Sequence, residues 1–168
     1  LWTYVLLAGA VLVIEVARLR MPAFNRFFFE RFSGFVRENE RAKMTGTMPY
    51  ILGIGLSFLF YRPDIATAGI CFLAVGDVAA TTVGERYGRT KLVGQKSLEG
   101  TMAFFAAAVL TGLALNLAGI PLMHGLIMAG ALTAAAVELM PLPLNDNLTV
   151  PLASGGAMEL IGRLTGCA

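Results

Sequence analysis

Charged residues and metal-binding side chains are both scarce in this sequence. Asp, Glu, Lys and Arg make up 14% of the 168 residues, whereas they make up about a quarter of a typical soluble domain. The only histidine is His124, which excludes a histidine-based metal site and leaves carboxylates as the ligands for any metal. The two cysteines, Cys71 and Cys167, form no CxxC pair, and this excludes a zinc motif or a disulfide framework.

Apolar residues, by contrast, make up 57% of the chain, and its mean hydropathy is +0.71. This composition is typical of an integral membrane protein, and the length allows a single domain over residues 1–168. The sequence begins with Leu1 inside an apolar run and lacks the basic region of a signal peptide. We therefore expect that an amino-terminal part precedes the chain.

The apolar runs predict an all-α fold, a polytopic transmembrane helical bundle. A helix needs about 20 apolar residues to cross a bilayer. A segment at 23–36 alternates phenylalanines with Arg26 and Arg31, which indicates an amphipathic helix lying in the plane of the lipid headgroups. Six segments are apolar enough to be membrane helices, at about 1–19, 47–61, 64–83, 99–118, 121–140 and 147–166.

Basic residues predict the orientation. Eleven of the thirteen fall in or beside the connections after the first and third membrane helices, which the positive-inside rule places in the cytoplasm. The net charge of +2 is small, so this asymmetry carries the information. The same topology brings four acids to the cytoplasmic face, namely Asp77, Glu99, Glu138 and Asp146.

Asp77 lies inside an apolar helix, where a carboxylate costs a few kcal/mol and needs a partner, a proton or a cation. Gly76, Ala80, Gly84 and Gly88 follow at intervals of four residues, which lets a neighbouring backbone come close. A purely structural alternative is a packing helix whose acid pairs with an arginine.

The segment "GERYGRTKLVGQKS" (84–97) combines glycines with four basic residues, a composition suited to binding a phosphate group. It is not a Walker A loop, because GxxxxGK[ST] is absent. An ordinary basic cytoplasmic loop remains the alternative, as a solvated charge run does for "RENERAKMTG" (37–46).

The segment "ELMPLPLNDNLTVP" (138–151) interrupts the apolar pattern with three prolines, and non-helical backbone at membrane depth is tolerated where it lines a cavity. Asn145 or Asp146 can cap the following helix, but capping explains one polar residue better than four together. Convergent carboxylates beside basic residues suit Mg²⁺ bound to a polyphosphate, and phosphoryl transfer needs chiefly metal, positive charge and positioning.

Three of these stretches resemble the polyprenol kinase family, which includes dolichol kinases, phytol kinases and CTP-dependent diacylglycerol kinases. "GDVAATTVGERYGRTKLVGQKSLEG" resembles its GDxxAxxxGxxxGxxK…KSxEG signature, and "NDNLTVPL" resembles its [ND]DN-[LF]-x-[VI]-P signature. "RENERAKMTG" followed by "YILG" resembles the R-x-x-E…TG…LG segment. The resemblance covers about residues 15–156.

The resemblance implies a lipid kinase that transfers the γ-phosphoryl group of a nucleoside triphosphate, CTP in preference to ATP, to a membrane lipid alcohol. Mg²⁺ would be the cofactor, the bilayer would supply the acceptor, and nucleic acid is not an expected partner. The expected catalytic residues are Asp77, Lys96, Glu99 and Asp146. The expected metal ligands are Asp77, Glu138 and Asp146. The expected nucleotide-binding residues are Arg37, Gly84, Gly88, Lys91, Lys96, Ser97 and Asn147.

Two other functions use the same residues. A cytidylyltransferase would transfer a nucleotidyl group and release pyrophosphate, whereas a kinase leaves a nucleoside diphosphate. A transporter would place acids through the depth of the membrane, whereas four acids here gather at one face. Glu15 and Glu159 lie elsewhere, each within reach of an arginine of its own helix, Arg18 and Arg163 respectively. No residue pattern identifies the lipid alcohol or the base.

Overall fold

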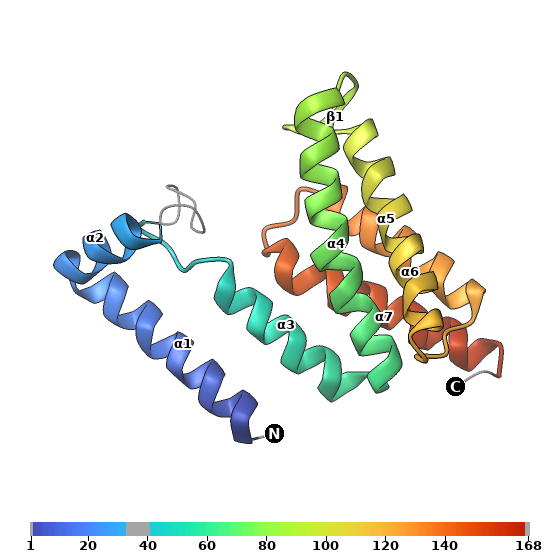
Figure 1. Cartoon of the computed structure of the whole chain (residues 1–168), viewed down its shortest axis with the longest axis horizontal. Coiled ribbons are helices and arrows are strands. Elements are labelled where there is room, and N and C mark those ends of the chain that lie inside the picture. The colour runs from blue at the N-terminus through green and yellow to red at the C-terminus, as the bar shows by residue number, and fades with distance from the viewer. Residues whose placement is uncertain (1, 33–40, 167–168) are drawn as a thin grey trace. The chain divides into compact units, whose positions relative to one another are not determined.

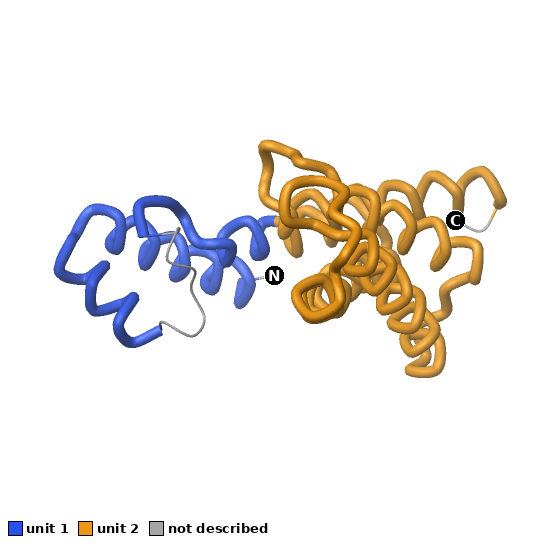
Figure 2. Tube along the Cα trace, turned by 90° about the horizontal axis from the view of Figure 1, so that it is seen from above, with its two compact units in different colours: residues 1–52 blue, residues 53–168 orange. Residues whose placement is uncertain are grey.

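The computed structural model describes residues 2–32 and 41–166 and divides the chain into two compact units, residues 1–52 and 53–168 (Figure 2). Helices dominate the described residues, and two short antiparallel strands form a hairpin between α4 and α5 (Figure 1). The elements in chain order are α1 (Trp2–Arg20), α2 (Pro22–Arg31), α3 (Thr47–Phe60), α4 (Pro63–Tyr87), β1 (Lys91–Val93), β2 (Lys96–Ser97), α5 (Leu98–Leu117), α6 (His124–Leu139) and α7 (Asp146–Leu164).

The predicted helical architecture is confirmed, because each of the six apolar segments forms a helix. Three helices, α1, α4 and α5, are long and apolar enough to cross a membrane, and α3 and α6 are shorter apolar helices. Large apolar side chains are exposed along several helices, which suits contact with lipid tails. Six crossings remain a prediction from the sequence.

A buried ion pair organises the first unit. Arg18 Nη2 lies 2.9 Å from Glu15 Oε2, and both side chains are almost fully buried. Arg18 also donates to the backbone carbonyl of Lys43, while Glu15 accepts hydrogen bonds from the backbone N–H and the hydroxyl of Thr45 at 3.0 and 2.9 Å. The expected pairing of Glu15 with Arg18 is therefore confirmed, and the pair also fastens the segment preceding α3 to α1.

The predicted amphipathic helix forms α2, with Pro22 at its first turn, where a missing N–H costs no hydrogen bond. Phe29 is buried, and the guanidinium groups of Arg18 and Arg41 lie 5.5 and 5.3 Å from the centroid of its ring. Phe27 and Phe32 are exposed, as a headgroup-level helix requires. The remainder of the predicted segment, residues 33–36, lies outside the described residues.

In the second unit, α4 packs on α5, α6 and α7. Small residues make this close approach possible, because a Cβ added at Gly76 would lie 2.7 Å from the Phe104 ring of α5. A Cβ added at Gly130 of α6 would lie 2.7 Å from the sulfur of Met158 in α7. Figure 1 shows α4 and α5 side by side, with the hairpin joining their ends.

Pro151 lies inside α7, where it removes the N–H that would bond the carbonyl of Asn147. That carbonyl lies against α3, since a Cβ added at Gly53 would be 2.6 Å from it. One turn further on, the Tyr61 hydroxyl donates a hydrogen bond of 2.7 Å to the carbonyl of Leu152. The proline of the second signature thus stands where α7 packs closely on α3 and the residue that follows it.

The first prediction concerns the buried pair of the first unit. Replacing Arg18 with Met leaves the Glu15 carboxylate buried without its cation, and breaking a buried pair in this way costs about 3–5 kcal/mol. We expect a much lower unfolding temperature in detergent, followed by circular dichroism. Arg26→Met, at an exposed position of α2, is the matched control and should change that temperature little.

A double variant, Glu15→Leu with Arg18→Met, should recover much of the loss, because it removes both charges instead of one. Equal unfolding temperatures for Arg18→Met and Arg26→Met would show that the Glu15–Arg18 pair does not hold this unit together.

Candidate functional site

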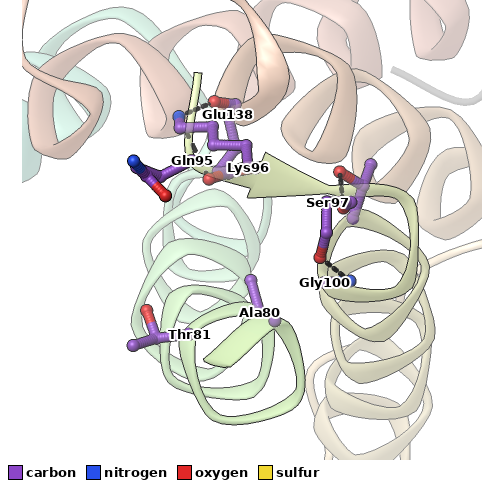
Figure 3. A pocket seen from close by; sticks show the side chains of 9 residues that line it. Ala80, Thr81, Gln95, Lys96, Ser97, Gly100 and Glu138 are labelled. Atoms are coloured by element: carbon purple, nitrogen blue, oxygen red, sulfur yellow. Dashed lines mark hydrogen bonds and ion pairs between the residues drawn. The ribbon is translucent and has the colours of Figure 1, made fainter. Parts of the chain in front are cut away.

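A cavity of about 80 Å³ lies where the hairpin meets three helices of the second unit (Figure 3). A water molecule needs roughly 10–15 Å³, so the cavity has room for several waters or a small polar group. Its lining residues come from α4 (Ala80, Thr81, Gly84), the hairpin (Gln95, Lys96, Ser97), α5 (Gly100, Thr101) and α6 (Glu138).

Lys96 is the centre of the polar contacts at this cavity. Its Nζ atom lies 3.1 Å from Glu138 Oε1 and 3.1 Å from Asp146 Oδ2, and it also donates to the backbone carbonyl of Glu138. Two of these contacts, with the Glu138 carbonyl and with Asp146, are hydrogen bonds, and the contact with the Glu138 carboxylate is an ion pair. Figure 3 shows the Lys96 and Glu138 side chains meeting at the edge of the cavity.

The position of Lys96 fits the two helix ends that it joins. Glu138 is in the last turn of α6, where carbonyl groups lack helical partners and a cation is favourable. Asp146 is the first residue of α7, where a carboxylate is favourable. Burial alone would lower the pKa of Lys96, but its hydrogen bonds and charge pairing with Glu138 and Asp146 outweigh burial and raise it.

Ser97 and three signature glycines bring α4 and α5 together beside the cavity. Ser97 is buried, and its hydroxyl oxygen accepts a hydrogen bond of 3.2 Å from the Gly100 N–H, which caps the start of α5. A Cβ added at Gly88 would lie 2.6 Å from that hydroxyl oxygen, and one added at Gly100 would lie 2.9 Å from the Ala80 carbonyl. Gly84 also faces Ser97 and lines the cavity.

The structure therefore gives the spacing of Gly76, Ala80, Gly84 and Gly88 a packing role, as the four-residue interval predicts. It does not test whether Gly84, Gly88 or Ser97 also binds a nucleotide.

The segment predicted as a basic loop contains regular structure. α4 continues to Tyr87, four residues beyond the predicted end of the third membrane helix, and the hairpin follows. Gly94 has φ of +57° and begins the two-residue turn between the strands, a conformation that favours glycine. Strands this short have no detectable periodicity, which explains why the sequence did not predict them.

Glu99 closes the connection between α4 and α5. Both of its carboxylate oxygens lie 3.2 Å from the backbone N–H of Thr90, and the Leu98 N–H donates to the Thr90 carbonyl at 2.9 Å. Glu99 also occupies the first turn of α5, where a negative charge is favourable. The structure thus gives Glu99 a local structural role, and its predicted catalytic role stays a prediction.

Asp77 is half-buried on α4, and its negative charge acts on Glu138, as does that of Asp146. Asp77 and Asp146 therefore both lie within electrostatic range of Glu138, and of the three predicted metal ligands Glu138 alone lines the cavity. Within residues 2–32 and 41–166, no group of three or more His, Cys, Asp or Glu side chains is close enough to hold a metal ion.

Mg²⁺, however, is commonly held by one or two carboxylates together with phosphate oxygens and water. Glu138 and Asp146, whose oxygens both lie 3.1 Å from the Lys96 ammonium group, are two carboxylates of this kind, and magnesium binding by them stays a prediction.

The remaining predicted residues have different surroundings. Asn145 caps α7 by accepting a hydrogen bond of 2.9 Å from the Asn147 N–H, which confirms the predicted capping. Lys91 is exposed on β1 and donates to the Gln95 carbonyl at 3.0 Å. Arg37, predicted to bind the nucleotide, lies outside the described residues, as does Glu40 of the same motif.

The site residues predicted from the sequence did not include three polar residues that line the cavity, Thr81, Gln95 and Thr101. Two of them were detectable by helical spacing, since Thr81 lies one turn after Asp77, and Thr101 lies four residues after Ser97. Gln95 gave no such signal, because it reaches the cavity only through the hairpin turn.

Comparison with known proteins finds relatives that are named as kinases of lipid alcohols. It is 31% identical to CTP-dependent diacylglycerol kinase 1 of Saccharomyces cerevisiae over 66% of the chain and 39% of that protein. It is 28% identical to the protein of the same name from Schizosaccharomyces pombe over 88% of the chain and 74% of that protein. It is 38% identical to phytol kinase of a Synechocystis species over 65% of the chain and 51% of that protein.

These relatives confirm the resemblance to the polyprenol kinase family. The chain spans only 39% of the length of the Saccharomyces cerevisiae relative. No family model matches the chain. No solved structure matches it significantly.

The second prediction tests the packing at Ser97. Gly88→Ala would place a Cβ 2.2 Å from the Gly84 carbonyl oxygen and 2.6 Å from the Ser97 hydroxyl oxygen. Such overpacking typically costs about 1–3 kcal/mol, so we expect a lower unfolding temperature in detergent. Gly125→Ala in α6 is the control, because no atom lies within 4 Å of the added Cβ, and alanine favours a helix. A Gly88→Ala protein as stable as Gly125→Ala would contradict the assigned packing role.

Proposed function

We propose that this chain is the membrane-embedded part of a lipid kinase. It transfers the γ-phosphoryl group of a nucleoside triphosphate, CTP in preference to ATP, to the hydroxyl of a membrane lipid alcohol. The acceptor is diacylglycerol or a polyprenol or phytol type of alcohol, and the reaction takes place at the cytoplasmic face.

The observation that carries this proposal is the cluster of Lys96, Glu138 and Asp146 beside a small polar cavity. Its residues come from the two segments that resemble the family signatures, together with the end of α6. The names of the three relatives support the proposed reaction class, since each is called a kinase of a lipid alcohol. CTP is proposed because two of those names state CTP dependence.

The charges of the cluster suit a cation bound to phosphates. Asp77, Glu138 and Asp146 carry three carboxylates, and Lys96 supplies one ammonium group against them. Glu138 and Asp146 would hold Mg²⁺, with Asp77 nearby on α4. When bound, Mg²⁺ supplies charge neutralisation to the phosphate oxygens during transfer. Basic residues around the end of α4, namely Arg86, Arg89 and Lys91, are exposed and available for the polyphosphate.

The chemical step then follows from positioning. The lipid hydroxyl oxygen forms a bond to the γ-phosphorus while the bond from that phosphorus to the β,γ-bridging oxygen breaks, releasing a nucleoside diphosphate. The hydroxyl proton passes to a carboxylate of the cluster, which releases it to water. Since phosphoryl transfer depends mainly on positioning and charge, the chain's main contribution is to hold these groups at the membrane surface.

The test is a transfer assay with purified protein, Mg²⁺ and γ-labelled CTP or ATP, supplied separately. The lipid panel contains diacylglycerol, phytol and a polyprenol. We expect label to appear in one class of lipid, with more from CTP than from ATP. Release of pyrophosphate with no labelled lipid would replace the kinase with a cytidylyltransferase, and protein that binds no nucleotide would overturn both.

The third prediction concerns Asp146. Replacing it with Asn keeps the shape and removes a charge from the cluster, so transfer should fall by roughly 100-fold or more. Asp64→Asn is the matched control, because Asp64 lies in the first turn of α4, far along that helix from Asp77, and should retain activity. Comparable activities of the two variants would remove Asp146 from the catalytic machinery.

The fourth prediction concerns the side of the membrane. Leu92 is exposed on β1, so Leu92→Cys, in a background with Cys71 and Cys167 replaced by Ser, places one thiol on the hairpin. A membrane-impermeant maleimide should label this thiol in inside-out vesicles and leave it unlabelled in right-side-out vesicles. The opposite pattern would place the hairpin, and with it the site, outside the cytoplasm.

A further inference from the structure

Lys96 makes two hydrogen bonds and a further ion pair with two neighbouring helix ends, and this arrangement favours a role other than binding phosphate. A lysine that binds a phosphate needs a free N–H donor directed at the ligand. The Lys96 ammonium group instead contacts Glu138 and Asp146, through hydrogen bonds to the Glu138 carbonyl and the Asp146 carboxylate and an ion pair with the Glu138 carboxylate. Its side chain is only about one-third exposed, at 32%.

Both partners of Lys96 are distant from it in the sequence, and the hairpin itself pairs only β1 with β2. Glu138 and Asp146 lie 42 and 50 residues after Lys96, at the last turn of α6 and the first residue of α7. Between them runs the segment 140–145, which contains two prolines and forms no helix. Lys96 is therefore the residue that ties β2 to both ends of this segment.

The same contacts determine where the two carboxylates lie. Glu138 and Asp146 repel each other, and without a cation between them they would move apart. If the carboxylates of Glu138 and Asp146 moved apart, Lys96 would lose its contact with one of them. Lys96 therefore sets the distance between their oxygens. Its contact with the Glu138 carbonyl also stabilises the end of α6.

We propose that Lys96 is a positioning residue, which holds Glu138 and Asp146 side by side and joins the ends of α6 and α7, and that the exposed basic residues around the hairpin bind the phosphates. This proposal rests on the proposed function for its catalytic consequence. Its structural content, the connection of α6 to α7 through Lys96, stands independently of that function.

The experiment compares Lys96→Met, Lys96→Arg and the matched control Lys91→Met in the full chain in detergent. Hydrogen exchange of residues 140–148 reports the connection between α6 and α7. CTP binding in EDTA reports phosphate recognition without metal, and the transfer assay reports kcat and KM.

We expect Lys96→Met to speed exchange across residues 140–148 and to lower kcat about 10- to 100-fold, the range found when groups supporting a metal site are removed. Its affinity for CTP in EDTA should stay within about threefold of the wild type, while Lys91→Met should weaken that affinity without changing exchange. Lys96→Arg should restore part of both exchange protection and kcat, because a guanidinium can still bridge two carboxylates. A Lys96→Met protein with unchanged exchange and CTP affinity weakened tenfold or more would overturn the proposal and make Lys96 a phosphate ligand.

A measurement on the wild type covers the case in which Lys96→Met does not fold. An amine-acylating reagent should modify Lys96 much more slowly than Lys91, because the Lys96 donors are engaged and its side chain is half-buried. Added CTP in EDTA should protect Lys91 and leave Lys96 unchanged. Equal acylation of the two lysines, or protection of Lys96 by CTP, would contradict the positioning role.

The two hypotheses can fail separately. The kinase would be refuted and the positioning role supported if the wild type labels no lipid, while Lys96 resists acylation and Lys96→Met exchanges faster at 140–148. The kinase would be supported and the positioning role refuted if the wild type is active and Lys96 is acylated as readily as Lys91.

Discussion

One ammonium group joins the elements that form the candidate site. Lys96 connects a hairpin strand with the last turn of α6 and the first residue of α7, through two hydrogen bonds and a further ion pair. Without it, two carboxylates would face each other at the ends of helices that an extended, proline-containing segment connects. Glu138 is the buried charge of this group, and Lys96 pairs with it as well as with the more exposed Asp146.

The glycines of the first signature serve the same geometry. Gly84, Gly88 and Gly100 let the end of α4 approach the start of α5 so closely that the Ser97 hydroxyl lies between them. Because Ser97 directly follows Lys96, this packing also fixes the position of the Lys96 backbone, from which its side chain extends. Glu99 adds a further restraint by accepting from the Thr90 backbone. Residues that were predicted to bind a nucleotide therefore also form the packing that orients Lys96. One signature can combine a binding role and a packing role.

Helix positions followed from the sequence because apolar runs and prolines mark them. Pro22 and Pro63 stand in the first turns of α2 and α4, as their fixed φ predicts. Capping by Asn145 and the pairing of Glu15 with Arg18 were also predictable, since each involves residues close in sequence. The partners of Lys96 were not, because they lie 42 and 50 residues away and only packing brings them near. The hairpin was not predicted from the sequence because its strands have only three and two residues.

The distribution of charge around the cavity favours a ligand that carries both signs. Asp77 and Asp146 act on Glu138, and these three carboxylates against the Lys96 ammonium group give the cluster beside the cavity a net negative charge, which attracts a cation. Arg86, Arg89 and Lys91 are exposed around the end of α4 and the hairpin, where they attract an anion. A simple cation would neutralise only the carboxylates, and a free phosphate would be repelled by those carboxylates. A divalent cation chelated by a polyphosphate neutralises both groups at once, and this complementarity favours a metal–nucleotide complex over either ion alone.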